Sequence, residues 1–285
     1  MSRTGNGRAV FITGAAGGIG TATTRALAER GYRVYAGVRG ETPHLQEAGG
    51  VQQIRVDVTD PKSVAEAAAE VARLQDGQGL HAVVNNAGII IQGPLELVPA
   101  EDLYRQFAIN VFGPAEVTRA FAPLLRKAHG RLINISAPSA VVPLPFASPI
   151  SASKAALDAL SDATRVELGA QGVAVITVVP GAIDTPIFTK AEAAAESAFA
   201  DADPARLAIY RSRLEAVAAA MAKMRTSKPE TVADTIVKAI EATRPKTRYV
   251  ANTDARAALV LSRLPVRLRD RVLTGILGLR KAEAA

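Results

Sequence analysis

The strongest constraint on this chain is the regular alternation of short apolar runs with helix-length segments. The apolar runs predict strands at 9–13, 32–38, 53–58, 80–85, 130–136, 173–179 and 247–251. The segments between them predict helices at 18–30, 61–74, 99–127, 150–170 and 228–242, and only the interval 42–50 gives no clear signal. Strands that alternate with helices form parallel βαβ units, whose right-handed crossovers place helices on both faces of the sheet. We therefore expect an α/β fold with a doubly wound parallel sheet of about seven strands.

Length and composition indicate one domain over residues 1–285, because no linker or internal repeat divides the chain. The first seven residues are polar and lack the apolar core of a signal peptide. No apolar run approaches the ~20 residues that span a bilayer. With zero cysteines and three scattered histidines, thiolate catalysis is excluded and no metal site is expected. These features predict a cytoplasmic protein without a membrane-spanning segment.

A glycine-rich turn, 13–20, follows the first predicted strand and opens the first predicted helix. Its glycines, Gly14, Gly18 and Gly20, let the backbone turn sharply and approach a ligand closely. The helix that follows points its free N–H groups and positive end at the same place, where a pyrophosphate binds well. A turn in this position predicts a dinucleotide site in a Rossmann-like sheet.

Four later motifs stand where ligands meet such a sheet, at the carboxyl ends of the strands. They are Asn85-Asn86-Ala87-Gly88, Asn110, Lys154 and Pro180-Gly181. With the glycine turn they resemble the short-chain dehydrogenase/reductase family, and the resemblance runs from about Arg8 to the end of the chain. Arg248-Tyr249-Val250 and the helices expected after it are similar to the branch that includes steroid and retinol reductases.

The second predicted strand ends at Val38 and Arg39, where a chain that prefers NAD usually carries an acid for the ribose 2′-hydroxyl. A guanidinium suits a 2′-phosphate instead, which predicts NADP(H) as the cofactor. The resemblance adds Asp57 for the adenine, and the Ile183 backbone with the Thr185 hydroxyl for the carboxamide. The predicted cofactor-binding residues are Thr13, Gly14, Gly18, Ile19, Gly20, Arg39, Asp57, Val58, Asn86, Ala87, Gly88, Lys154, Pro180, Gly181, Ile183 and Thr185.

The family's proton-donating tyrosine and its oxyanion-binding serine are both replaced. Ile150 stands four residues before Lys154, where the family has the tyrosine. Thirteen residues earlier Ala137 takes the place of the serine, and Ser139 is the nearest substitute. The candidate catalytic residues that are left are Asn110, Lys154 and Ser139.

Losing a general acid removes about 10²–10⁴ in rate, and losing an oxyanion donor removes about 10²–10³. Three functions therefore stay open. The first is a non-redox isomerase, cyclase or pericyclase that encloses an apolar substrate near a retained NADP. The second is an atypical NADP-dependent oxidoreductase in which Lys154, Ser139 or a water supplies the proton. The third is a non-catalytic partner subunit or a sensor of NADP redox state.

Three further segments have predicted roles. The family pairs long helices such as 99–127 and 150–170 between subunits, which implies a homodimer or homotetramer. Residues 186–226 form the expected substrate loop or lid, with the loop 141–146 as another wall. Residues 244–285 form a basic helical extension.

All of the net charge of +7 lies in that extension, with ten Lys and Arg against three Asp and Glu. Such a tail can bind acidic lipid or nucleic acid. The ~3.6-residue period of its apolar positions favours packing on the body instead, and no nucleic-acid partner is expected. The positions predicted to pack are Leu261, Leu264, Leu268, Val272 and Ile276.

Overall fold

The computed structural model describes residues 7–45 and 49–282, and its centre is a seven-stranded sheet in the order β3-β2-β1-β4-β5-β6-β7. All neighbouring strands are parallel. The strands are β1 (Ala9–Thr13), β2 (Arg33–Val38), β3 (Val51–Arg55), β4 (Ala82–Asn85), β5 (Arg131–Ile135), β6 (Ala174–Val179) and β7 (Arg248–Val250). The expected doubly wound α/β fold is confirmed.

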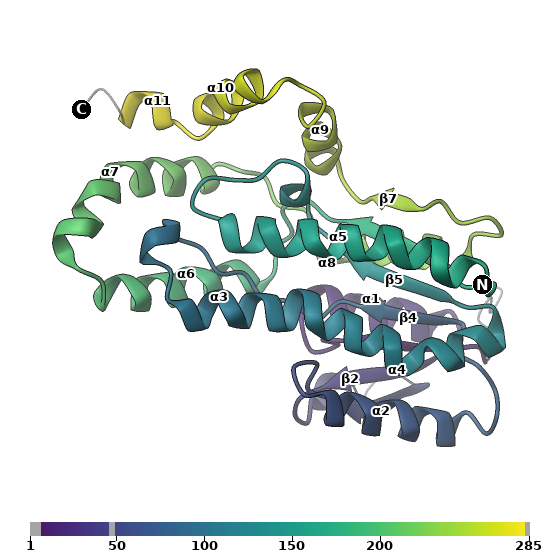
Figure 1. Ribbon diagram of the computed structural model, residues 1–285. Helices are drawn as coiled ribbons and strands as arrows, with labels where there is room; N and C mark the ends of the chain where they lie inside the picture. The colour runs from purple at the N-terminus through teal and green to yellow at the C-terminus, as the bar shows by residue number, and fades with distance from the viewer. Residues whose placement is uncertain (1–6, 46–48, 283–285) are drawn as a thin grey trace.

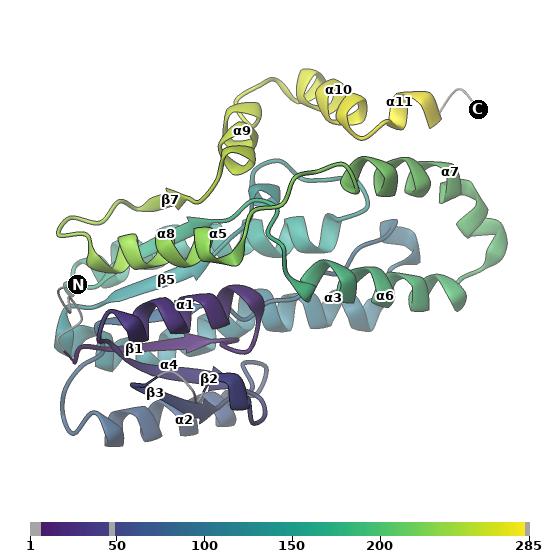
Figure 2. The ribbon, with the colours of Figure 1, turned by 180° about the vertical axis from the view of Figure 1, so that it is seen from behind.

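Helices cover both faces of the sheet (Figures 1 and 2). On one face lie α2 (Pro61–Leu74), α4 (Gly113–Ala128) and α5 (Ser148–Gly169), and on the other lie α1 (Gly18–Glu29) and α8 (Pro229–Glu241). A helix α3 (Ala100–Phe107) runs into α4. Beyond the sheet lie α6 (Pro186–Ala200), α7 (Pro204–Met221), α9 (Thr253–Leu261), α10 (Val266–Ile276) and α11 (Leu279–Ala282).

The alternating side chains of the strands build two separate cores. In β1, Val10 and Ile12 point to the face covered by α1 and α8, whereas Phe11 packs with Phe121 of α4 on the other face. Because both faces of a parallel sheet are covered, its inner strands β1, β4 and β6 are largely apolar rather than alternating with polar residues. This explains why the sequence shows short continuous apolar runs.

The chain leaves β1 toward β2 on one side and reaches β4 on the other, so the strand order reverses between β1 and β4. Ligands of doubly wound sheets bind at such a switch point, beyond the carboxyl ends of the strands. The turn after β1 and the turn after β4 both carry sequence-predicted site residues.

Most predicted boundaries agree with the structure within two residues, and two elements differ more. The third strand was expected at 53–58 but spans Val51–Arg55, because β2, with which it pairs, ends at Val38. The predicted helix 99–127 is interrupted by a π-helical turn, η3 (Ala108–Phe112), which contains Asn110. Part of the uncertain interval 42–50, residues 46–48, and the polar residues 1–6 lie outside the described residues.

The C-terminal extension is helical as expected, yet its predicted packing face is wrong in part. Leu268 and Ile276, expected to pack on the body, are 45% and 64% exposed. Leu273 and Leu277 are the buried residues instead. The reason is that the extension packs on the body where α11 meets α7, and the side of α10 that carries Leu273 and Leu277 faces that junction.

Candidate active site

The glycine turn after β1 is closely packed, which explains its glycines. Gly14 has a φ of +64°, and a Cβ on it would lie 2.8 Å from the Ala87 Cα. A Cβ on Gly18 would lie 2.5 Å from Thr185 Cγ2, so the turns after β1, β4 and β6 meet here. The structure thus brings together residues from three of the predicted cofactor segments.

The first turn of α1 offers free N–H groups at this place. Gly17 is its N-cap and has no side chain to accept from them, and the first turn carries no acidic residue. An uncapped helix N-terminus without acids is a good site for an anion, because its N–H groups and dipole favour negative charge. Gly18, Ile19 and Gly20 form this first turn and fit the pyrophosphate of a dinucleotide.

Thr13 fastens the β4 turn to β1. Its hydroxyl accepts hydrogen bonds from the backbone N–H groups of Asn86 and Ala87, both at 3.1 Å. The Asn86 side-chain amide donates to the Thr13 and Gly14 carbonyl oxygens at 3.0 Å. The predicted residues Thr13, Asn86 and Ala87 therefore hold the turns after β1 and β4 together through mutual contacts.

At the adenine end of the predicted site, Arg39 is exposed just after β2. Asp57 is already engaged, because one carboxylate oxygen accepts from the Thr59 N–H at 2.9 Å and the Thr59 hydroxyl at 2.7 Å. These hydrogen bonds lower the pKa of Asp57, and nearby Arg39 lowers it further. Val58 packs against Gly113 at the start of α4.

Lys154 lies buried at the carboxyl edge of β5. Its ammonium Nζ donates to the Ile135 carbonyl oxygen at 2.6 Å. A Cβ on Gly88 would lie 3.9 Å from Nζ and 3.4 Å from Asn110 Oδ1, so these three predicted residues share one place. Burial disfavours the charged amine and lowers the pKa of Lys154 to about 8, although nearby Asp158 opposes the shift.

Asn110 ties the π-helical turn to the segment after β4. Its side chain accepts from the Ile89 N–H at 2.9 Å and donates to the Ile89 carbonyl at 3.0 Å. Gln106, one turn earlier, donates to the same carbonyl and to the Ser153 hydroxyl. Ser153 precedes Lys154 on α5, so this network fixes the helix that carries the lysine. The sequence analysis did not identify Gln106 and Ser153 as site residues. Only their spacing from Asn110 and Lys154 would have indicated their role.

The structure places Ile150 and Ala137, the two apolar residues that the sequence analysis singled out, near the start of α5. Ile150 lies in the first turn of α5, one turn before Lys154, and is 8% exposed. Ala137 begins the short helix η4 (Pro138–Ala140), which packs against α5. Ser139, the predicted substitute, is buried within η4.

A buried carboxylate stands behind Lys154 that the sequence analysis did not identify. Asp158 follows Lys154 by one helical turn and pairs with Arg248 of β7 at 2.9 Å. Burial raises the pKa of Asp158, while neighbouring Ser136, Arg248 and Lys154 lower it. The sequence did contain an indication of this pair, because a Lys and an Asp four residues apart on a helix lie on the same side of it.

The predicted carboxamide segment is held by the C-terminal extension. The Gly181 N–H donates to Asn252 Oδ1 at 2.8 Å, and the Ala182 N–H donates to Asp254 Oδ2 at 2.7 Å. Asn252 and Asp254 precede and open α9, about seventy residues along the chain, so no local pattern could reveal the contact. Ile183 is buried beyond this turn and pairs with Ser227.

We expect Asp254→Ala to lower the free energy of unfolding by about 1–3 kcal/mol, because it leaves a backbone donor without its charged acceptor. Urea unfolding of this variant measures the loss. Asp270→Ala is the matched control, since Asp270 is an exposed acid of α10 that holds no loop. Equal midpoints for the two variants would contradict the anchoring role.

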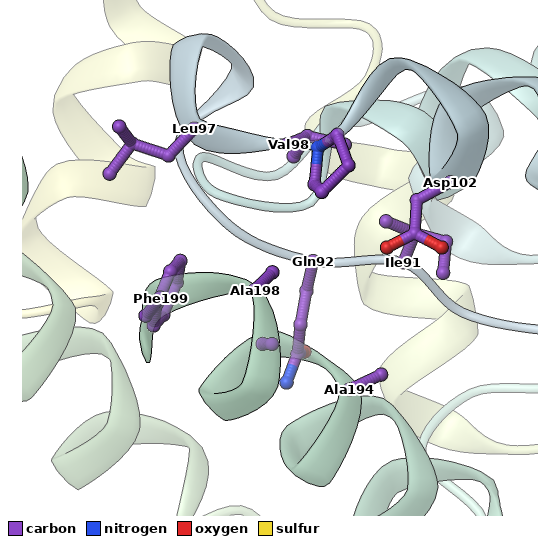
Figure 3. Close-up of a pocket in the computed structure, with 10 residues that line it drawn as sticks. Ile91, Gln92, Leu97, Val98, Asp102, Ala194, Ala198 and Phe199 are labelled. Carbon is purple, nitrogen blue, oxygen red and sulfur yellow. The ribbon is translucent and has the colours of Figure 1, made fainter. Parts of the chain in front are cut away.

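A small cavity of about 10 Å³ lies between α6 and the segment that follows β4 (Figure 3). This volume accommodates about one water molecule. Apolar side chains dominate its wall, with Gln92 and Asp102 as the polar exceptions. The lining residues are Ile91, Gln92, Leu97, Val98, Pro99, Asp102, Ala194, Ala195, Ala198 and Phe199. Within the described part of the chain, no three acidic or histidine side chains gather as metal ligands would.

A family model described as short chain dehydrogenase matches residues 8–196, and the chain belongs to this family. It is similar to estradiol 17-beta-dehydrogenase 2 of Mus musculus, with 40% identity over 189 residues, which are 63% of this chain and 49% of that protein. The chain thus spans about half the length of that relative.

Two further proteins match most of the chain. A 3-amino-tetrahydro-pyrrolizinone reductase of Xenorhabdus hominickii is 32% identical over 252 residues, 87% of this chain and 88% of that protein. The crystal structure of a short chain dehydrogenase from Burkholderia cenocepacia J2315 in complex with NADP superimposes with a TM-score of 0.74. It is 29% identical, and the match covers 96% of this chain and all of that one.

Proposed function

We propose that this protein is an NADP(H)-dependent oxidoreductase of an apolar substrate, in which the Lys154 ammonium holds the proton that a tyrosine holds in the family. The observation that carries the proposal is the position of Lys154, buried at the carboxyl edge of the sheet beside Gly88 and Asn110, where burial lowers its pKa to about 8. An acid with a pKa near the working pH gives and takes protons most effectively. The named relatives with reductase or dehydrogenase activity support a redox reaction.

The residues around the carboxyl ends of β1 and β2 fit NADP(H). The uncapped start of α1 suits the pyrophosphate, and exposed Arg39 suits a 2′-phosphate by a forked hydrogen bond. The similar structure from Burkholderia cenocepacia is a complex with NADP. When bound, NADPH supplies a hydride.

The residues of the chain have separate roles in this proposal. Lys154 Nζ holds a proton for the substrate atom that gains negative charge. The Asn110 network fixes the turn of the chain that faces Lys154. Asp158 acts as a positioning residue, because its charge favours the ammonium form and so keeps the pKa of Lys154 from falling further.

Deuterium transfer tests the redox reaction. We expect that NADPH labelled with deuterium at C4, incubated with a panel of ketones, enones and cyclic imines, passes the label to at least one product. Mass spectrometry of the products measures it. Consumption of a substrate without label in the product and without loss of NADPH would overturn the redox assignment.

A second candidate function rests on a different observation. Ile150 and Ala137 leave apolar surface where the family has two hydroxyls. Such surface favours a non-redox isomerase, cyclase or pericyclase that orients an apolar substrate beside bound NADP. In that case the product is an isomer of the substrate, and oxidised and reduced cofactor support the reaction equally.

We propose that residues 186–226 form the lid of the substrate site. The segment forms α6 and α7, and the start of α7 is hydrogen-bonded to the turn at Leu95–Leu97, before α3. Glu96 of that turn accepts from Arg206 Nε at 3.1 Å and from the Tyr210 hydroxyl at 3.0 Å. Phe146 packs edge-on against Tyr210, which joins the 141–146 loop to the same lid.

We also propose a homodimer or homotetramer through the helices at 100–128 and α5. A groove of about 300 Å³ lies between α4 and α5. Leu160 in the wall of this groove is 39% exposed, and Phe112 and Val166 elsewhere on the same helical segments are 62% and 69% exposed. Large exposed apolar side chains beside a groove are typical of a subunit interface.

Arg39→Asp tests the choice of phosphate. We expect the Kd for NADPH to rise about 10–100-fold, because a charge-assisted hydrogen bond worth about 1.5–3 kcal/mol is lost and an acid repels the 2′-phosphate. The Kd for NADH falls or stays unchanged. Quenching or enhancement of cofactor fluorescence measures both constants. Arg33→Asp, at the other end of the same strand, is the matched control and leaves both unchanged.

A further inference from the structure

The C-terminal extension carries the whole net charge of the protein. Residues 244–285 hold ten Lys and Arg against three Asp and Glu, whereas residues 1–243 hold equal numbers of each sign. Of the described acids in the extension, Asp254 is engaged with the Ala182 N–H and Asp270 lies 3.8 Å from Arg269 Nε. The exposed surface of the extension is therefore strongly basic.

The same surface is also apolar, because the helices of the extension leave large side chains in solvent. Val260 of α9 is 66% exposed. In and around α10, Val266, Leu268 and Ile276 are 60%, 45% and 64% exposed. The extension packs on the body through other residues, Leu273, Leu277 and Leu279, all of which are buried.

Basic and apolar side chains alternate along this outer face. Exposed Arg256 precedes Val260 by one helical turn. Exposed Arg267 and Arg271, also one turn apart, flank Leu268 on α10. We define the outer face of the extension by these exposed residues: Arg256, Val260, Arg263, Arg267, Leu268, Arg271 and Ile276.

The outer face stands clear of the sheet. Figures 1 and 2 show α9, α10 and α11 at one side of the molecule, beyond α5 and α7 and far from α2. Nothing among the described residues covers the exposed side of α10. The face is therefore free to meet a partner without any change in the body.

We propose that the outer face of the extension docks on an anionic lipid bilayer surface. A helix that lies in a bilayer interface carries apolar residues for the acyl boundary and Lys or Arg for anionic headgroups. Each basic residue near such a surface strengthens binding about fivefold. No helix among the described residues has the length and apolarity to cross a membrane, so the contact is peripheral. The proposal does not depend on the reaction that the protein catalyses.

Lipid is favoured over nucleic acid and over a second copy by the combination of side chains. Nucleic-acid binding rests on phosphate contacts and needs no exposed Leu or Ile on the binding face. Two copies of this face would bring Arg256, Arg263, Arg267 and Arg271 against the same charges, which repel. An anionic bilayer satisfies both the charged and the apolar residues.

Co-sedimentation of the full chain with vesicles tests the proposal. We expect binding to vesicles of equal parts phosphatidylglycerol and phosphatidylcholine, and at least tenfold weaker binding to phosphatidylcholine alone. Added salt weakens the binding, because it screens exposed charges. Equal binding to both kinds of vesicle, or to neither, would overturn the proposal.

Two pairs of substitutions separate charge from apolar contact. We expect Arg267→Glu with Arg271→Glu, and separately Leu268→Ser with Ile276→Ser, each to weaken vesicle binding at least tenfold. The control Arg33→Glu with Lys127→Glu makes the same charge change at exposed positions on the body and leaves binding within twofold. All four side chains of the test pairs are exposed, so thermal unfolding of the variants should match the parent.

The alternatives give different results. If the apolar pair has no effect and a DNA or RNA duplex competes with the vesicles, the face binds phosphates in general and the lipid proposal fails. If sedimentation equilibrium shows a self-association that the apolar pair abolishes, while vesicles do not bind, the face is an interface between copies. If the control pair weakens vesicle binding as much as Arg267→Glu with Arg271→Glu does, binding depends on net charge alone and the proposed face is not a binding site.

Discussion

Replacing Ile150 by tyrosine together with Ala137 by serine is expected to raise kcat/KM for NADPH-dependent ketone reduction by about 10²–10⁴. The introduced tyrosine would stand one helical turn before Lys154, whose charge lowers the pKa of a phenol. The introduced serine would add an oxyanion donor worth about 10²–10³ by itself, but groups that act as a unit do not multiply fully. The rate of NADPH consumption with simple ketones measures the gain.

Ile150→Phe with Ala137→Ser is the matched control. It places a ring of the same size beside Lys154 without a hydroxyl, so any gain from shape alone appears in both variants. A tyrosine variant no faster than the phenylalanine variant, with both folded and both binding NADPH, would show that these two positions do not face the reacting atoms.

Replacing Lys154 by methionine should abolish most of the remaining activity. We expect a loss of about 10²–10⁴ in kcat/KM, because the proton-bearing group is removed while an apolar chain of similar length fills the buried site. In the parent protein reduction needs the ammonium form, so kcat/KM should fall as the pH rises through about 8, the pKa of Lys154. Rate profiles from pH 6 to pH 10 at saturating NADPH measure this dependence.

Lys238→Met, at an exposed lysine of α8, is the control and should keep both the rate and the pH profile. Asp158→Asn gives a second readout. Without the carboxylate that favours the ammonium, the pKa of Lys154 falls further, and the profile should shift to lower pH. If Lys154→Met loses NADPH binding but keeps its turnover at saturating NADPH, the lysine serves the cofactor alone.

The third sequence-based interpretation, a non-catalytic partner or redox sensor, makes its own prediction. Such a protein binds NADP(H) but turns over no substrate, and Ile150→Tyr with Ala137→Ser has no reason to change that. The deuterium experiment and the double variant therefore separate it from both enzymatic functions.

The fold was predictable from the sequence because the pattern of apolar residues along the chain shows which side chains are buried. In a parallel sheet covered on both faces, the inner strands are short apolar runs, and β1 at Ala9–Thr13 coincides with its predicted range. The glycine turn was also predictable, since Gly14 takes a positive φ that other residues rarely adopt. The proximity of Lys154 and Gly88 was predictable from the same local patterns together with the strand order.

Contacts across long sequence separations were not predictable. Nothing near Asp254 indicates that its carboxylate anchors the Ala182 N–H, and nothing near Arg248 indicates that it pairs with Asp158. The prediction of which side of α10 packs on the body was wrong for the same reason. The period of Leu268, Val272 and Ile276 shows that one face of α10 is apolar, but it does not show whether the body or solvent meets that face.

Lys154 as a buried acid is the centre of the proposed mechanism, and its titration tests that role most directly. Protein carrying lysine labelled with carbon-13 at Cε gives one NMR signal per lysine, and Lys154→Met identifies the signal of interest. We predict that this signal titrates near pH 8, well below the ordinary value of 10.5. A titration near 10.5 would contradict the mechanism, because the amine would then hold its proton too tightly to serve as the acid.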